Sequence, residues 1–195
     1  MAKGFKSTPQ GYSASFNDEE VTLMIKLFKD VALTLEPEPA EGTDELAELV
    51  GITEDPQVPL DPAVARMLPV ASDDPEVADE FRRYTERNLR EMKIGHLKMA
   101  AVDIEAKNVV LNEEHARAWA AALNDVRLTL GSRLDISSDA DAEAVAAHND
   151  WRKVQTVEDY MSLVYNFVTW LQDTLMEAML TQLDDSSPEN TEGRS

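Results

Sequence analysis

Four long segments of this chain place apolar residues three and four positions apart, and this spacing constrains the fold more than any other feature. The segments are 18–35, 75–106, 112–131 and 156–183. Apolar residues at this spacing form a stripe along an α-helix, and the stripe has to be buried against other elements. Capping residues, prolines and glycines mark the expected helix ends. The sequence therefore predicts a mainly α fold, a helical bundle of about four long helices.

The segments outside these helices have different compositions. Residues 4–16 alternate around a Pro-Gln-Gly turn, which predicts a short N-terminal β-hairpin packed on the helices. Residues 36–62 form an acidic, proline-rich connector with a short helix expected at 44–50, and another short helix is expected at 63–68. We expect a single helical domain, 1–183, and a disordered acidic tail, 184–195.

Buried faces follow from the same spacing. In the helix at 75–106, the predicted buried seam is Ala78, Phe81, Thr85, Asn88, Met92, Gly95, Met99 and Val102. The basic residues of that helix alternate with acidic ones, which is typical of a solvated, salt-bridged face. They are Arg82, Arg83, Arg87, Arg90 and Lys93. We expect the helix at 112–131 to end at Gly131.

The last helix carries two apolar stripes. The first, predicted to face the core, is Val157, Met161, Val164, Val168, Leu171, Leu175 and Ala178. Beside it lie Leu163, Phe167 and Trp170, which we expect at an interface. A helix that is apolar on two sides is usually central in a bundle or buried against a partner chain.

Composition excludes several classes of function. The chain has no cysteine, so disulfides, thiolate catalysis and cysteine-bound metal clusters are excluded. Its net charge of −20 disfavours direct nucleic-acid binding and favours a basic protein partner. No apolar run reaches the roughly 18 residues of a membrane-spanning helix, and no secretory signal is visible. We expect no membrane association and a cytoplasmic location.

A polar group on the helix at 112–131 is the main candidate site. Asn124, Asp125, Arg127 and Arg133 lie on or near its buried side. We expect Arg127 or Arg133 to pair with Asp125 or Asp173. A structural network is the favoured interpretation, and a ligand site is the alternative, because no nucleophile or histidine accompanies the group.

The sequence gives little support for a metal site or a cofactor site. His96, His115 and His148 lie on separate segments without the spacing of a metal site, so no metal is expected. The chain contains no phosphate-binding or nucleophile-elbow motif, and no cofactor is expected.

Several segments together resemble a known family. They are LNEEHARAWAAALNDVRLTLGSRL from Leu111, EFRRYTERNLREMK from Glu80, TWLQDTL from Thr169, and Met67-Leu68-Pro69. With them the chain resembles, over most of residues 1–182, an actinobacterial family described as a domain of unknown function. That family includes the oxidative-stress regulator AosR. The resemblance implies a regulator that acts through a transcription factor or an RNA polymerase component, and it does not imply an enzyme.

Three hypotheses about function follow from the sequence. The first is a non-enzymatic regulatory or adaptor protein that binds a basic partner such as a sigma factor. The second is a structural homodimer in which 157–178 pairs with its counterpart or with the 81–102 seam. The third is an enzyme or small-ligand binder centred on Asn124, Asp125, Arg127 and Arg133. Thiol-based sensing, which the resemblance implies for AosR, has no cysteine to act on in this chain.

Overall fold

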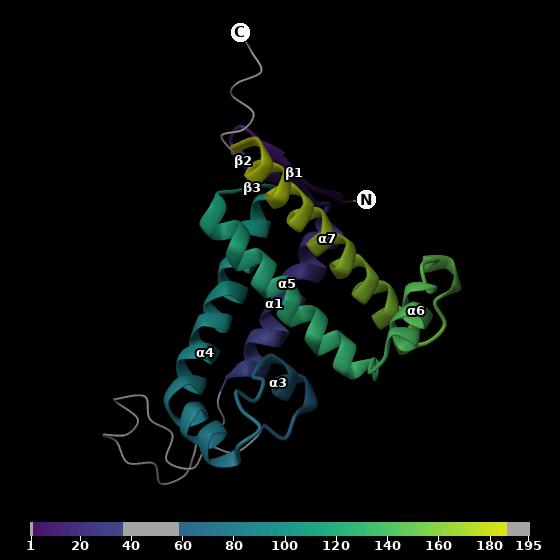
Figure 1. The fold of residues 1–195 in the computed structure, drawn as a ribbon. Coiled ribbons are helices and arrows are strands. Elements are labelled where there is room, and N and C mark those ends of the chain that lie inside the picture. Colours follow the sequence, from purple (N-terminus) through teal and green to yellow (C-terminus); the bar gives the residue numbers. More distant parts are fainter. Residues whose placement is uncertain (1, 37–58, 187–195) are drawn as a thin grey trace.

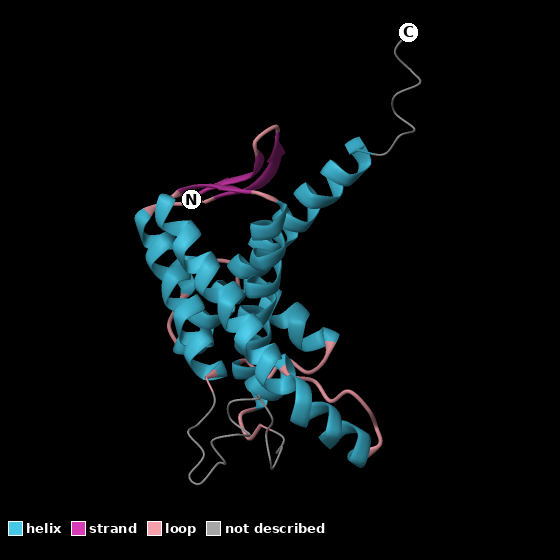
Figure 2. Cartoon of the chain, turned by 90° about the vertical axis from the view of Figure 1, so that its left-hand side faces the viewer, coloured by secondary structure: helices cyan, strands magenta, loops and turns pink. Residues whose placement is uncertain are grey.

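The computed structural model describes residues 2–36 and 59–186, and for 183–186 it describes the helical backbone alone. In these ranges long helices pack together, and a small sheet covers one end of them (Figures 1 and 2). The prediction of a mainly α fold with a short N-terminal hairpin is confirmed. The short helix expected at 44–50 lies outside the described residues.

Helix α1, Asp18–Leu35, has the predicted bounds because both of its ends are encoded locally. The Asn17 side chain accepts a hydrogen bond from the Glu20 N–H at 2.9 Å, and the Glu20 carboxylate accepts one from the Asn17 N–H at 2.9 Å. This capping box satisfies two backbone donors at the helix start. Along the helix, the buried stripe is Val21, Met24, Phe28, Val31, Ala32 and Leu35.

The sheet has one strand more than the predicted hairpin. Strands β1, Lys3–Thr8, and β2, Gly11–Ser15, pair antiparallel, and β3, Asn108–Leu111, pairs antiparallel with β2. Gly4 lets β1 approach the last helix, since a Cβ there would lie 2.7 Å from Thr174 Cγ2. The Phe5 N–H donates to Thr174 Oγ1 at 3.1 Å, which fixes the sheet on that helix.

Helix α5, Glu113–Arg133, occupies the centre of the fold. It packs against α4, Pro75–Asp103, against α7, Val157–Ser186, and against the short α3, Pro62–Met67. Helix α1 packs mainly on α4, and the short α6, Asp139–Ala146, packs on α7 (Figure 1). Two 3-10 turns, Ile104–Ala106 and Trp151–Lys153, complete the connections.

Trp119 joins the sheet to the helices. Its side chain is fully buried in α5, and its ring lies 5.4 Å from Phe5, 6.2 Å from Phe16 and 5.6 Å from Phe28 between centroids. These rings come from β1, from the residues before α1 and from α1 itself. Aromatic contacts at these distances stabilise a core beyond the area they bury.

The buried side of α4 differs from the prediction. Of the predicted seam only Ala78 is buried, whereas Phe81, Met92 and Val102 are 51%, 50% and 67% exposed. The inward side carries Arg82, Leu89, Lys93, Leu97, Ala100 and Ala101, which are buried or partly buried. The prediction failed because the charged residues on that side pair with one another and with neighbouring elements, so they tolerate burial.

Two further predictions about helix ends and faces were wrong. Helix α5 continues past Gly131 to Arg133, and Asp135, at φ 53°, supplies the left-handed residue that ends it. The Ile136 N–H then donates to the Gly131 carbonyl at 2.9 Å, which is the pattern of a Schellman motif. On α7, Val157 is 75% exposed and does not join the core stripe.

The predicted disordered tail begins inside the last helix. Helix α7 continues to Ser186, two residues beyond Asp184. The rest of the predicted tail lies outside the described residues.

Candidate functional site

The four polar residues predicted to form one site on α5 are placed in different environments. Asp125 is fully buried, Arg127 is partly buried, and Asn124 and Arg133 are exposed. Neither arginine pairs with Asp125 or Asp173, as the sequence had led us to expect, because each has a partner on a different element. The group therefore divides into separate contacts.

Asp125 pairs with Lys93, a partner that the sequence analysis missed. The Lys93 Nζ donates to Asp125 Oδ1 at 2.6 Å across the interface between α4 and α5. The Lys93 side chain is 15% exposed, whereas Asp125 is at 0%. Asp125 Oδ2 accepts no hydrogen bond from the described residues. A buried ion pair of this kind is costly to break from one side.

Burial raises the pKa of the Asp125 carboxyl, because the charged form is poorly solvated there. The hydrogen bond and charge of Lys93 act in the opposite direction, as does the charge of His96, but they do not cancel the effect of burial. His96 lies one turn after Lys93, and its Nδ1 is buried without a partner among the described residues. Lys93, His96 and Asp125 thus lie together at the α4–α5 interface.

Arg127 connects α5 to α7. Its Nη1 donates to Gln172 Oε1 at 2.7 Å, and its guanidinium lies 5.9 Å from the centroid of the Tyr165 ring. Gln172 in turn donates to the Ala120 carbonyl at 3.3 Å. The charge of Arg127 is therefore held by an amide and an aromatic face, which suits a packing role.

Arg133 connects the end of α5 to the start of α3. Its Nη2 donates to Asp61 Oδ2 at 2.6 Å, and the Asp61 side chain also caps α3 by accepting from the Ala63 N–H at 2.8 Å. Asn124, Asp125, Arg127 and Arg133 line neither the groove beside His96 and Asn112 nor the small hollow between Leu68 and Leu89.

A second buried network was expected on a solvated face. Glu86 accepts from Arg82 Nη1 at 2.9 Å and from Arg90 Nη2 at 2.7 Å, all on α4. The side chain of Arg82 is 7% exposed, that of Glu86 16% and that of Arg90 15%. Arg90 Nη1 also donates to the Leu35 carbonyl at 2.9 Å, at the C-terminus of α1.

A signal for this network was present in the sequence. Extending the buried stripe of Leu97, Ala100 and Ile104 backwards by three and four residues leads to Lys93, Arg90, Glu86 and Arg82. The exposed members of the basic cluster are Arg83 and Arg87.

A third set of polar contacts is centred on Asp103. It accepts from Trp119 Nε1 at 2.9 Å, and its Oδ2 lies 2.8 Å from His115 Nδ1. One carboxylate oxygen thus serves both groups and positions the central tryptophan. Beside His115 lies an open groove lined by His96, Asn112, Glu113, Glu114, Arg117 and Ala118. Among the described residues no cluster of His, Asp or Glu is arranged to hold a metal ion.

The interface candidates on α7 lie in different environments. Leu163 is buried at 5% within the chain, so it is not available to a partner. Phe167 is partly buried, and Trp170 is 40% exposed with its ring 5.9 Å from Phe167 between centroids. Within the described ranges, no helix is both long and apolar enough to cross a membrane.

Two more exposed aromatic residues lie just before α7 and near its start. Trp151 and Tyr160 are 53% and 44% exposed and lie edge to face at 6.2 Å. Tyr160 shares a side of α7 with Phe167 and Trp170, because spacings of seven and three residues return to the same side of a helix. We refer to Trp151, Tyr160, Phe167 and Trp170 as the α7 aromatic surface.

Comparisons with known proteins find one matching family model and several similar proteins. The model of a domain of unknown function, DUF2017, matches residues 2–179. The chain is also similar to the oxidative stress regulator AosR of Mycobacterium tuberculosis and of Mycobacterium bovis, at 32% identity over 145 residues. The match covers 63% of this chain and 66% of each relative, slightly less than two-thirds of the relative's length. No solved structure matches the chain.

Proposed function

Since this chain belongs to the DUF2017 family, a domain of unknown function, we propose that it is a non-enzymatic, cytoplasmic regulatory protein of the oxidative-stress response. The observation that carries the proposal is the 32% identity, over 145 residues, to relatives named oxidative stress regulator. The absence of cysteine excludes thiol chemistry in this chain as the means of sensing an oxidant.

Charge supports a protein partner for this regulator. A net charge of −20 repels nucleic acid and attracts a basic protein surface, with association that weakens as salt increases. The partner we propose is a component of the transcription machinery with a basic surface, such as a sigma factor or an RNA polymerase subunit. The chain would control transcription by occupying that surface.

The α7 aromatic surface supports a place for this contact. Exposed tryptophan and tyrosine residues supply most of the binding energy at many protein interfaces. Trp170 and Tyr160 keep 40% and 44% of their area exposed, and each ring contacts one neighbour, Phe167 and Trp151 respectively. Acidic residues Glu158 and Asp159 lie in the first turn of the same helix. Such a surface fits a basic partner with an apolar centre.

The experiment is affinity capture of the tagged full chain from its host after peroxide treatment, with quantitative mass spectrometry. The test variant replaces both Phe167 and Trp170 by alanine. The matched control replaces Met176 and Leu180, which are 42% and 58% exposed on α7, by alanine. Both variants remove apolar area from the same helix, and in the test variant part of that area is the side of Phe167 that packs against the core.

The expected result is recovery of a sigma factor or polymerase subunit by the wild type and by the control, with recovery lowered about 10-fold or more in the test variant. Recovery should also decrease as salt is raised. If no protein of the transcription machinery is enriched, the regulatory proposal is wrong. If such a protein is enriched equally with all three chains, the proposed surface is wrong.

A further inference from the structure

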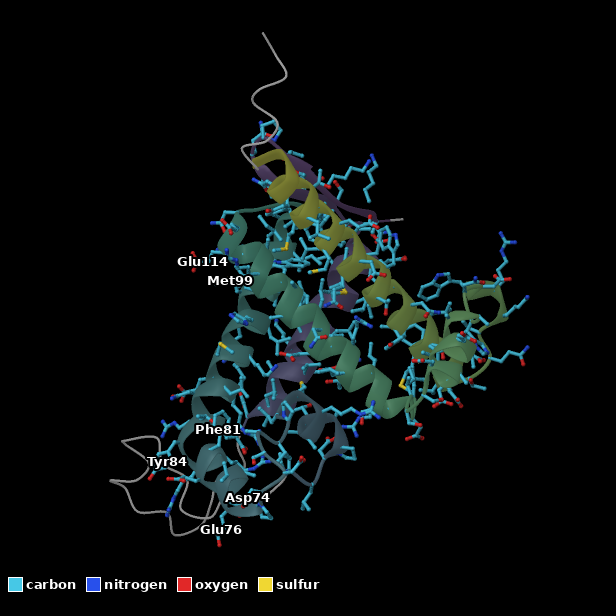
Figure 3. The ribbon with its side chains drawn as sticks, viewed as in Figure 1. Asp74, Glu76, Phe81, Tyr84, Met99 and Glu114 are labelled. Atoms are coloured by element: carbon cyan, nitrogen blue, oxygen red, sulfur yellow. The ribbon has the colours of Figure 1, made fainter. Side chains whose placement is uncertain are left out.

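An exposed apolar seam runs along the outer side of α4. It consists of Val77, Phe81, Tyr84, Asn88, Met92, Gly95, Met99 and Val102. All but Val77 and Tyr84 belong to the seam that the sequence had placed in the core. Five of them, the two valines and Phe81, Tyr84 and Met92, are between 50% and 67% exposed. Phe81, Tyr84 and Met99 lie toward the outer side of α4 in Figure 3. The seam is about 38 Å long at the rise of an α-helix.

Gly95 has no role in the packing of the described chain. A Cβ at this position would meet nothing within 4 Å, although Gly95 lies well inside a helix of 29 residues. Glycine inside a helix costs about 0.5–1 kcal/mol relative to alanine. Glycine also lets another chain approach the helix backbone closely. Its position on the seam leaves room for a second molecule to approach the backbone of α4.

The seam is self-complementary in the antiparallel direction. From Val77 forward the steps are 4, 3 and 4 residues to Asn88, and from Val102 backward they are 3, 4 and 3 residues to Met92. The cumulative steps are 4, 7 and 11 residues forward and 3, 7 and 10 backward, so opposing residues of an antiparallel helix pair stay within one residue, about 1.5 Å, of shared layers. The layers pair Val77 with the partner's Val102, Phe81 with the partner's Met99, Tyr84 with the partner's Gly95, and Asn88 with the partner's Met92.

Side-chain size and charge agree with this register. Tyr84, which has the bulkiest side chain of the seam, lies opposite the partner's Gly95, and the glycine leaves room for the tyrosine ring. Glu80 and Lys98 are exposed on the same flank of α4, because their separation of 18 residues is five full turns. In the antiparallel pair, residues on one flank face the same flank of the other helix. Glu80 then faces the partner's Lys98, and Lys98 faces the partner's Glu80.

We propose that this seam is the interface of a homodimer in which two copies of α4 pack antiparallel about the point between Asn88 and Met92. The proposal is independent of the regulatory function, since the α7 aromatic surface lies on a different helix. A second copy is the occupant that the register and the flanking charges select.

The test measures the mass of the full chain by light scattering over about 1–100 µM. Wild type should approach twice the 21.7 kDa mass of one chain. Gly95→Gln introduces a side chain where the partner's Tyr84 is expected, and it has open space in the single chain, so it should fold and remain monomeric. The matched control, Leu180→Gln, changes an exposed leucine on α7 and should dimerise like wild type.

The register has its own test because the chain has no native cysteine. Val77→Cys and Val102→Cys are prepared separately and oxidised alone or as a mixture. Disulfide-linked dimers should form in the mixture and not with either variant alone. Cross-linking of each variant with itself would instead indicate a parallel pair and overturn the proposed register.

Two mass measurements would overturn the homodimer itself. One is a wild-type chain that stays monomeric throughout the concentration range. The other is a Gly95→Gln variant that dimerises as strongly as wild type. A monomeric wild type whose capture of another protein is lost in Gly95→Gln would assign the seam to that protein instead of a second copy.

Discussion

At the scale of single residues, Asp125 is the least exposed charged side chain among the described residues. It is fully buried, and its one ion-pair partner among the described residues is Lys93, on another helix. The sequence identified Asp125 as a buried polar residue but assigned it the wrong partner. Spacing within one helix cannot show which residue of a different helix will face it, so Lys93 was not predictable.

Lys93→Met should lower the free energy of unfolding by about 3–5 kcal/mol at neutral pH, because it leaves a buried carboxylate without its partner. Burial already raises the pKa of Asp125, and removal of Lys93 raises it further. The folded chain then binds a proton at a pH where the unfolded chain does not. Stability should therefore recover as the pH falls toward 3.8, the ordinary value for this carboxyl. Denaturant unfolding from pH 7 to pH 4.5 or so measures both effects.

The double variant Lys93→Met with Asp125→Leu is the control. It removes both charges, so its stability should lie near that of wild type and the added recovery at low pH should disappear. A single variant as stable as wild type at neutral pH would show that Asp125 is not confined to this contact.

At the scale of elements, α4 explains both the success and the failure of prediction. Where one face alone was apolar, as in α1, the periodicity and the capping box of Asn17 and Glu20 were enough to predict the bounds. Helix α4 has an apolar outer seam and an inner side whose first half is charged. Periodicity identifies the faces of a helix but does not decide which face is buried. In α4 the ion pairs of Arg82, Glu86 and Arg90 allow the charged face to be buried, and the apolar face is exposed instead.

Glu86→Gln should lower the free energy of unfolding by about 2–3 kcal/mol, because it leaves two largely buried guanidinium groups without a counter-charge. Arg90 also donates to the Leu35 carbonyl, so the last turn of α1 should fray and lose protection from hydrogen exchange. Glu91→Gln is the matched control on the same helix. Glu91 is 62% exposed in its pair with Arg87, and its loss should change stability by less than about 0.5 kcal/mol. Equal effects of the two substitutions would contradict the inner network.

At the scale of the whole molecule, α5 organises the fold and the two exposed surfaces remain for contacts. Polar residues of α5 bind α4 through Asp125, α7 through Arg127 and the start of α3 through Arg133. The sequence predicted these residues as a group, and the structure distributes them over three interfaces. Apolar surface is left exposed on α7 and α4, on elements that pack against α5 with their other sides.

The proposed regulation is tested most directly by transcript profiles after a peroxide challenge. A strain lacking the chain is complemented with wild type, with the Phe167→Ala and Trp170→Ala double variant, or with the Met176→Ala and Leu180→Ala control. The expected result is an altered oxidative-stress response that wild type and the control restore and the aromatic variant does not, at equal protein levels. A deletion strain whose transcript response matches that of the parent would contradict a regulatory role for this protein.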